Sequence, residues 1–337
     1  MKNLIKYLKP YTKESILAPL FKLLEVAFDL MVPVVVAKMI DTGVAQQDYT
    51  FIFRCAAILL AMALLGLLCS VTAQFFAARA SAGFGASIRQ TMFDHIQKFS
   101  FAMLDRAGSD TLITRINDDV NQVQNGVNMC LRLILRSPFI VFGATAVAFT
   151  VNVKCAVIFA VTVPVLFAVI FGIMLTSIPL FKKVQEKLDR ITELTRENLT
   201  GVRVIRAFCR EKYAVGEFED SNRELTRLNE FVGKISAVLN PLTYAMINIA
   251  AVILIDKAAI EVNLGNLQQG ETVALYNYMM QIIVELIKLA ALIITLNKSM
   301  ACAGRISEVL AMKPEMEYPE ADTVSYEAGN PAVEFAD

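Results

Sequence analysis

Ionisable side chains interrupt the first and the last long apolar stretches of the chain. Lys22, Glu25 and Asp29 stand in the first stretch, and Glu285 and Lys288 stand in the last. Charged groups at bilayer depth are costly, so they pair with one another or face a cavity. Lys22 and Glu25 are three residues apart, as are Glu285 and Lys288, which allows pairing along one helix face. Structural ion pairs and cavity-lining groups both remain open interpretations.

A cavity lined by charges would also need an adaptable apolar wall, which aromatic and thioether side chains provide. If Asp29 and Glu285 face the cavity, we expect it to prefer cationic amphiphiles. The candidate pathway residues are Glu25, Phe28, Asp29, Met31, Met279, Glu285 and Lys288.

Other chemistry finds little support in the residue pattern. His95 is the single histidine, and the six cysteines are scattered without a CxxC pair. Scattered cysteines within apolar runs are typical of free structural thiols, so we expect no metal site and no catalytic residues. The formal net charge is zero, and we expect no nucleic-acid partner.

The apolar pattern predicts an all-α membrane protein. The chain has 337 residues, of which 56% are hydrophobic, and its mean hydropathy is +0.53. A basic amphipathic helix over residues 1–14 is expected to lie on the membrane surface. Apolar segments long enough to cross a bilayer then follow. The six predicted spans are 16–41, 51–78, 132–151, 154–180, 236–260 and 271–296.

The placement of lysine and arginine predicts the orientation. These residues gather near the N-terminus and in the polar stretches 79–131 and 181–235, whereas the short turns carry only Lys154 and Lys257 at their edges. The positive-inside rule therefore places both termini and both long loops in the cytoplasm of a multi-pass protein of the cell membrane.

The two polar stretches keep the helical spacing of their apolar residues, so they predict continuations of the spans. About 50 residues separate each outer turn from the nearest loop tip, which corresponds to roughly 75 Å of helix. The tips fall near Met103 and Phe208. Stalks of this length favour machinery that is driven from the cytoplasm.

Several stretches in order resemble the transmembrane domain of ATP-binding-cassette (ABC) exporters, along essentially the whole chain. They include KMIDTG at 38–43, FSFAMLDRAGSDTLITRINDDVNQV at 99–123, TRENLTGVRVIRAFCREKYAVGEFED at 195–220, GNLQQGETVALYNYMMQI at 265–282 and ACAGRISEVLAMKP at 301–314. The resemblance implies the type I exporter (type IV transporter) fold, with an elbow helix at 1–14 and the domain at 15–312. LRLILRSPF at 131–139 is most similar to bacterial half-transporters, including those that work as heterodimers.

The resemblance also implies roles for the two loop tips. They would be coupling helices that dock on nucleotide-binding domains, the second on the domain of the partner subunit. Arg115 and Asp119 would stabilise the stalk. The first coupling helix would hold Ser100, Phe101, Met103, Leu104 and Asp105, and the second Arg206, Ala207, Phe208, Arg210, Glu211 and Tyr213.

One feature departs from full-length members of this family. The sequence contains no GxxxxGK[ST] motif, because its single Gly-Lys pair at 233–234 is followed by Ile235. Residues 313–337 are expected to be a linker and the first strand of a nucleotide-binding domain. This chain alone is therefore not expected to hydrolyse ATP, and ATP and Mg²⁺ would bind in that further domain.

The expected function is that of the membrane half of an ATP-driven exporter for amphiphilic drugs, lipids or peptides. Its partners would be a second half-transporter, identical or different, nucleotide-binding domains in cis and in trans, and the lipid bilayer. Two alternatives are a self-contained six-span channel or secondary transporter, and a membrane scaffold. Neither broken-helix repeats nor a selectivity-type loop supports the channel or secondary transporter.

Overall fold

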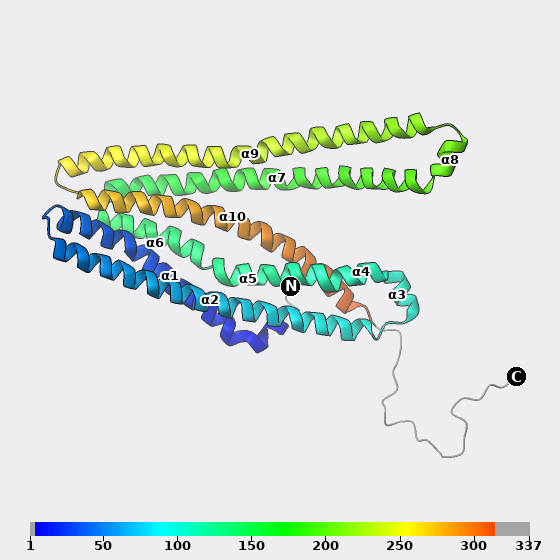
Figure 1. Cartoon of the computed structure of the whole chain (residues 1–337), viewed down its shortest axis with the longest axis horizontal. Helices are drawn as coiled ribbons and strands as arrows, with labels where there is room; N and C mark the ends of the chain where they lie inside the picture. Colours follow the sequence, from blue (N-terminus) through cyan, green and yellow to red (C-terminus); the bar gives the residue numbers. More distant parts are fainter. Residues whose placement is uncertain (1–3, 314–337) are drawn as a thin grey trace, which may run out of the picture. The chain divides into compact units, whose positions relative to one another are not determined.

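A computed structural model describes residues 4–313, and each element within them is a helix, which confirms the all-α prediction. The expected linker and strand at 313–337 lie outside the described residues except for Lys313. The elements, shown in Figure 1, are η1 (Ile5–Tyr11), α1 (Thr12–Lys38), η2 (Met39–Val44), α2 (Tyr49–Ile96), α3 (Phe101–Ala107), α4 (Ser109–Thr114), η3 (Arg115–Asp119), α5 (Val120–Leu133), α6 (Arg136–Val151), α7 (Val153–Thr200), α8 (Val202–Ala207), α9 (Glu211–Asn263) and α10 (Gln269–Ala311).

The N-terminal segment differs in detail from the expected amphipathic helix. Its described part is a 3-10 helix, η1, which runs directly into α1 at Thr12. The chain divides into two compact units. Of the described residues, unit 1 comprises 4–13, 78–128 and 296–313, and unit 2 comprises 14–77 and 129–295.

Five helical stretches of the described chain are long and apolar enough to cross a membrane. They contain α2, α5 with α6, α7, α9 and α10. The chain is thus a multi-pass membrane protein. α1 is not among the five, because Lys22, Glu25 and Asp29 interrupt its apolar run. The count of six spans therefore stays a prediction.

Side-chain caps make the corners between long helices short. Asn152 has an extended backbone, and its Oδ1 accepts the backbone N–H of Lys154 at 3.0 Å and of Cys155 at 3.2 Å. Because of this cap, a single residue, Asn152, separates the end of α6 from the start of α7. Asp48 Oδ1 likewise accepts the N–H groups of Thr50 and Phe51 at the start of α2.

In unit 2, α7 and α9 run side by side and are joined by α8 (Figure 1). Their facing residues, including Phe159 and Leu254, are almost completely buried in one apolar core with residues of α1, α6 and α10. Tyr278 on α10 ties that core to α1, because its hydroxyl donates to the carbonyl of Leu30 at 2.5 Å.

η2, which follows α1, and the start of α10 meet at a second polar contact in unit 2. The backbone N–H of Gly270 donates to Asp41 Oδ1 at 2.6 Å. A Cβ at position 270 would lie 2.3 Å from the carbonyl oxygen of Ala37, so only glycine allows this approach. Two of the resembling stretches, 38–43 and 265–282, are thereby brought together.

Unit 1 has its own core. Ile88 and Met92 of α2, Val120 and Val123 of α5 and Ile306 of α10 are almost fully buried against one another. This core supports α3, since Met103 and Leu104 pack on it.

Candidate functional site

Arg136, the first residue of α6, is the centre of a polar network in unit 2. Its Nη1 donates to Glu25 Oε1 at 2.5 Å, its Nη2 to Asp29 Oδ2 at 3.1 Å, and its Nε to Glu285 Oε1 at 3.4 Å. The arginine therefore joins α1, α6 and α10 through charge-assisted hydrogen bonds, the stronger kind. Its side chain is only 13% exposed, so these bonds replace most of its hydration.

Both expected pairs along one helix also form. Lys22 Nζ lies 2.6 Å from Glu25 Oε2, and Lys288 Nζ lies 2.8 Å from Glu285 Oε1. Ser137 donates to the other Glu285 oxygen at 3.0 Å. The network thus contains three carboxylates and three cations, and its formal charge is zero.

Exposure varies strongly along the network. The side chains of Glu25 and Glu285 are 11% and 4% exposed, whereas Asp29 is 41% exposed and Lys288 is 42% exposed. The expected cationic preference needed Asp29 and Glu285 to face a cavity. Both line one, and Asp29 is the more exposed of the two. Glu285 is enclosed by its partners.

Asp29 lines two cavities of unit 2. One, of about 480 Å³, also has Arg136 and Lys288 in its wall. The other, of about 350 Å³, also has Glu25 and Phe28 in its wall. The structure therefore brings Glu25, Phe28, Asp29, Glu285 and Lys288 together.

Two further candidate pathway residues lie elsewhere. Met279 is buried in the unit 2 core and is 2% exposed. Met31 is exposed on α1 and lines neither of the two cavities. Arg136 was not among the candidates, although the sequence held a signal. Glu25, Asp29 and Glu285 outnumber Lys22 and Lys288, so a further cation was needed for charge balance.

A second charged cluster in unit 1 joins η3 to α10. Arg115 Nη1 donates to Asp119 Oδ2 at 3.0 Å, as the i,i+4 spacing allows. Arg305 of α10 binds the same carboxylate with two nitrogens, Nε at 2.9 Å and Nη2. Burial alone would raise the pKa of the Asp119 carboxyl. The hydrogen bonds from Arg305 and Arg115 lower this pKa by more, so it lies below its ordinary value. Arg305, 186 residues from Asp119, was not among the candidates.

The first expected coupling helix corresponds to α3. Ser100 caps it, because its Oγ accepts the N–H of Met103 at 3.3 Å. Phe101 is 85% exposed and Asp105 is exposed, whereas Met103 and Leu104 face the unit 1 core. The helix thus presents one aromatic ring outward from an anchored base.

The residues expected for the second coupling helix lie at the end of α8 and in the turn and first residues of α9 that follow it. α8 ends at Ala207, and Phe208 follows it in a turn where Cys209 has a φ of 49°. Phe208 is 74% exposed, and Arg210 lies 5.5 Å from the ring centre of Tyr213. The remaining candidates at this tip, Arg206, Ala207 and Glu211, are exposed too.

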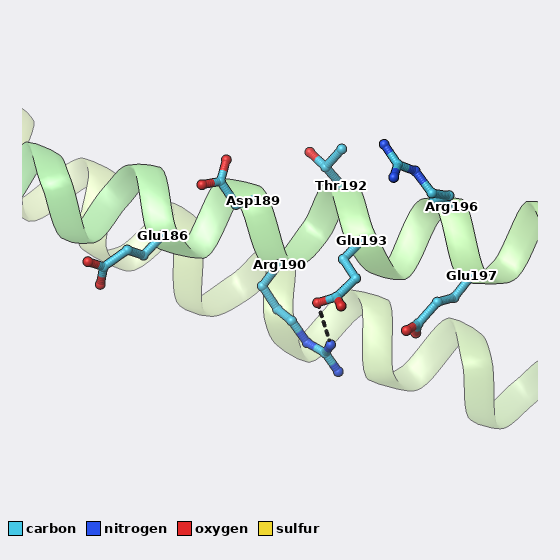
Figure 2. Close-up of a pocket in the computed structure, with 7 residues that line it drawn as sticks. All are labelled: Glu186, Asp189, Arg190, Thr192, Glu193, Arg196 and Glu197. Atoms are coloured by element: carbon cyan, nitrogen blue, oxygen red, sulfur yellow. Dashed lines mark hydrogen bonds and ion pairs between the residues drawn. The ribbon is translucent and has the colours of Figure 1, made fainter. Parts of the chain in front are cut away.

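A hollow of about 750 Å³ on unit 2 has no such convergence. Figure 2 shows its lining residues along α7, including Glu186, Asp189 and Glu197, spread over several turns of one helix. The one ion pair drawn there joins Arg190 and Glu193 at 2.8 Å. Both side chains are about half exposed, so this is a solvated helix face.

The family model of the ABC transporter transmembrane region matches residues 15–286. The chain belongs to this family. Most of the polar network, together with η3 and α7–α9, thus lies in an ABC transporter transmembrane region, as the resemblance indicated.

Relatives of the chain carry related names. An uncharacterized ABC transporter ATP-binding protein of Mycobacterium tuberculosis is 31% identical over 94% of this chain and 54% of its own length. The ABC transporter ATP-binding protein YfiB of Bacillus subtilis is 29% identical over 96% of this chain and 56% of its own length. An ATP-dependent lipid A-core flippase of Desulfotalea psychrophila is 27% identical over 70% of this chain and 42% of its own length. The chain therefore spans about half the length of these relatives.

Proposed function

We propose that this chain is the membrane-spanning half of an ATP-driven exporter. It forms the translocation pathway, and it receives the ATP-hydrolysis stroke through coupling helices at α3 and α8. The cargo is an amphiphilic molecule that leaves the cytoplasm.

The α7–α8–α9 hairpin is the observation that supports this function most directly. α7 has 48 residues and α9 has 53. At about 1.5 Å per residue each helix is roughly 70–80 Å long, more than twice the hydrocarbon thickness of a bilayer. The two helices share an apolar core over residues 155–174 and 247–258, and the hairpin carries the exposed Phe208 at its tip.

In this proposal, nucleotide-binding domains supply the ATPase activity, and a partner subunit supplies the second half of the pathway. Relatives named ATP-binding proteins support nucleotide-binding domains that bind ATP and Mg²⁺, in cis and in trans. A second half-transporter, identical or different, completes the pathway. The membrane is the cytoplasmic membrane, with both termini and both tips in the cytoplasm, as the distribution of lysine and arginine indicates.

Substitution of the tip aromatic rings tests the coupling. The transporter, with this chain joined to or paired with its ATPase domain, is reconstituted in proteoliposomes, and ATP hydrolysis and uptake of a fluorescent amphiphile are measured together. Phe208→Ala is expected to keep ATP hydrolysis within about twofold and to reduce uptake about tenfold or more, since interface anchors of this kind contribute about 1–4 kcal/mol.

Phe53→Ala is the matched control. Phe53 is 75% exposed, as much as Phe208, but it lies on α2 near an outer turn rather than at a tip. Its substitution is expected to change neither rate. Unchanged uptake by Phe208→Ala, or equal losses in both variants, would contradict coupling through this tip. Uptake that needs no ATP at all would favour the channel or secondary transporter instead.

A further inference from the structure

The cavity of about 480 Å³ in unit 2 has an unusual combination of walls. Charges come from Asp29, Arg136, Glu285 and Lys288, and Gln281 contributes an amide. Apolar side chains that include Val36 and Met280 form much of the rest. A ligand that fills it therefore needs a polar headgroup joined to an apolar chain.

The charges in the wall are arranged as an alternating row. Asp29 binds Arg136, Arg136 binds Glu285, and Glu285 binds Lys288. The two inner members are 13% and 4% exposed, while Asp29 and Lys288 at the two ends are 41% and 42% exposed. Asp29 and Lys288 therefore face the cavity as one anion and one cation, and each is exposed enough to bind a further partner.

Charge balance selects among ligands. The network is neutral as it stands, so a ligand with a single charge would leave an unbalanced charge in a site of low dielectric constant. A ligand that carries one positive and one negative group keeps the total at zero. It can pair with Asp29 at one end and with Lys288 at the other.

Gln281 adds a preference for the kind of cation. Its Oε1 is buried and accepts no hydrogen bond from any described residue. A buried acceptor without a donor costs about 1–3 kcal/mol. A primary ammonium can supply the missing N–H after rotation of this amide, whereas a quaternary ammonium has no N–H to donate.

We propose that this cavity binds a zwitterionic amphiphile whose headgroup joins a primary ammonium to an anionic group, as in a phosphoethanolamine lipid. The ammonium pairs with Asp29 and Gln281, the anionic group pairs with Lys288, and the acyl chain lies along the apolar wall. This inference names the cargo class of the proposed exporter and so rests on that function.

Binding is measured without ATP, on this chain in a non-ionic maltoside detergent. Displacement of an acyl-labelled lysophosphatidylethanolamine is followed by fluorescence polarisation. Unlabelled lysophosphatidylethanolamine is expected to compete about tenfold better than lysophosphatidylcholine, lysophosphatidic acid or an alkylamine, each with the same chain length, because one charged hydrogen bond contributes about 1.5 kcal/mol. Glycerophosphoethanolamine, which has the headgroup without the acyl chain, is expected not to compete.

Single substitutions locate the site. Asp29→Asn and Lys288→Gln are each expected to weaken lysophosphatidylethanolamine binding about tenfold. Asp256→Asn and Lys257→Gln remove exposed charges of α9 that do not line the cavity, and they are expected to bind like the wild type.

Equal competition by all the lysolipids would overturn the proposal even if a variant misfolds, because the ligand series uses the wild type alone. Unchanged binding by both cavity variants would overturn it as well. Either outcome leaves coupling through Phe208 intact, since that experiment measures ATP-driven uptake. Conversely, failed coupling would not alter the displacement series.

Discussion

The cluster around Asp119 allows a quantitative test of what holds unit 1 together. Asp119→Asn keeps the shape of the side chain and removes its charge. The carboxylate accepts two hydrogen bonds from Arg305 and one from Arg115. An asparagine has one acceptor oxygen, and its amino group would face guanidinium N–H groups instead.

The expected cost follows from burial. Breaking a buried ion pair costs about 3–5 kcal/mol. Arg305 and Arg115 are 39% and 24% exposed, so water can solvate both guanidinium groups after the change. We therefore expect local opening of unit 1 to become easier by about 2 kcal/mol, below the fully buried range. A change of this size corresponds to roughly a 30-fold increase in the open population.

Two buried cysteines report opening of each unit. Cys302 lies in the unit 1 core, and Cys155 is fully buried in unit 2. Maleimide labelling is followed peptide by peptide by mass spectrometry. Asp119→Asn is expected to speed labelling of Cys302 about 30-fold relative to Cys155. Because labelling requires opening, its intrinsic rate is that of the exposed thiol in the open state, and this intrinsic rate is the same in the wild type and in the variant.

Asp94→Asn serves as the control within the same unit. Asp94 is exposed and accepts a single hydrogen bond from Gln90 at 2.8 Å. Its loss is expected to change the labelling of Cys302 less than threefold, as for surface contacts in general. A Cys302 labelling rate in Asp119→Asn that equals the rate in Asp94→Asn would refute the structural role assigned to the cluster.

Four further outcomes can be measured by circular dichroism or by thermal exposure of the buried cysteine of the unit concerned, Cys302 in unit 1 or Cys155 in unit 2. The pKa of Asp119 is lowered in the fold, so the carboxylate stabilises the fold fully above the ordinary carboxyl range, and this stabilisation is lost as pH falls through the folded pKa. The wild type should therefore lose more thermal stability than Asp119→Asn between about pH 5 and pH 3. Arg136→Met should lower the melting temperature more than Asp29→Asn, since it leaves Glu25 and Glu285 short of a cation, at a cost of about 3–5 kcal/mol. Gly126→Ala places a Cβ 2.2 Å from Ser299 Oγ and should destabilise by about 1–3 kcal/mol. Gly304→Ala, which meets no atom within 4 Å, should stabilise by up to about 1 kcal/mol.

The sequence was informative where the relevant contacts lie within one helix. Lys22 with Glu25 and Glu285 with Lys288 could be paired from spacing alone, because residues three apart share a helix face. The all-α class followed from long apolar runs in the same way. These features need only the geometry of a single helix.

Contacts between helices could not be predicted in this way. The apolar sequence of α6 does not show that Arg136 would meet α1 and α10 at once. The same limit hid Arg305, which reaches Asp119 across 186 residues of sequence. A charge count gave a partial hint at the first site only. At the second tip, the bounds of α8 could not be read from the sequence either, because a six-residue helix carries little propensity signal.

The polar network also shows why structural pairing and cavity lining are compatible interpretations of intramembrane charges. A single ion pair satisfies both partners and leaves nothing for a ligand. A row of four alternating charges satisfies its inner members twice, here Arg136 and Glu285, and its end members once. The inner pair can therefore stay dry and fix α6 against α10. The end charges, Asp29 and Lys288, keep hydrogen-bonding capacity that water fills until a ligand of matching polarity displaces it. In the proposed site, exchange of this water for the zwitterionic ligand would leave the inner pair unbroken, so binding and release would not require the separation of buried charges.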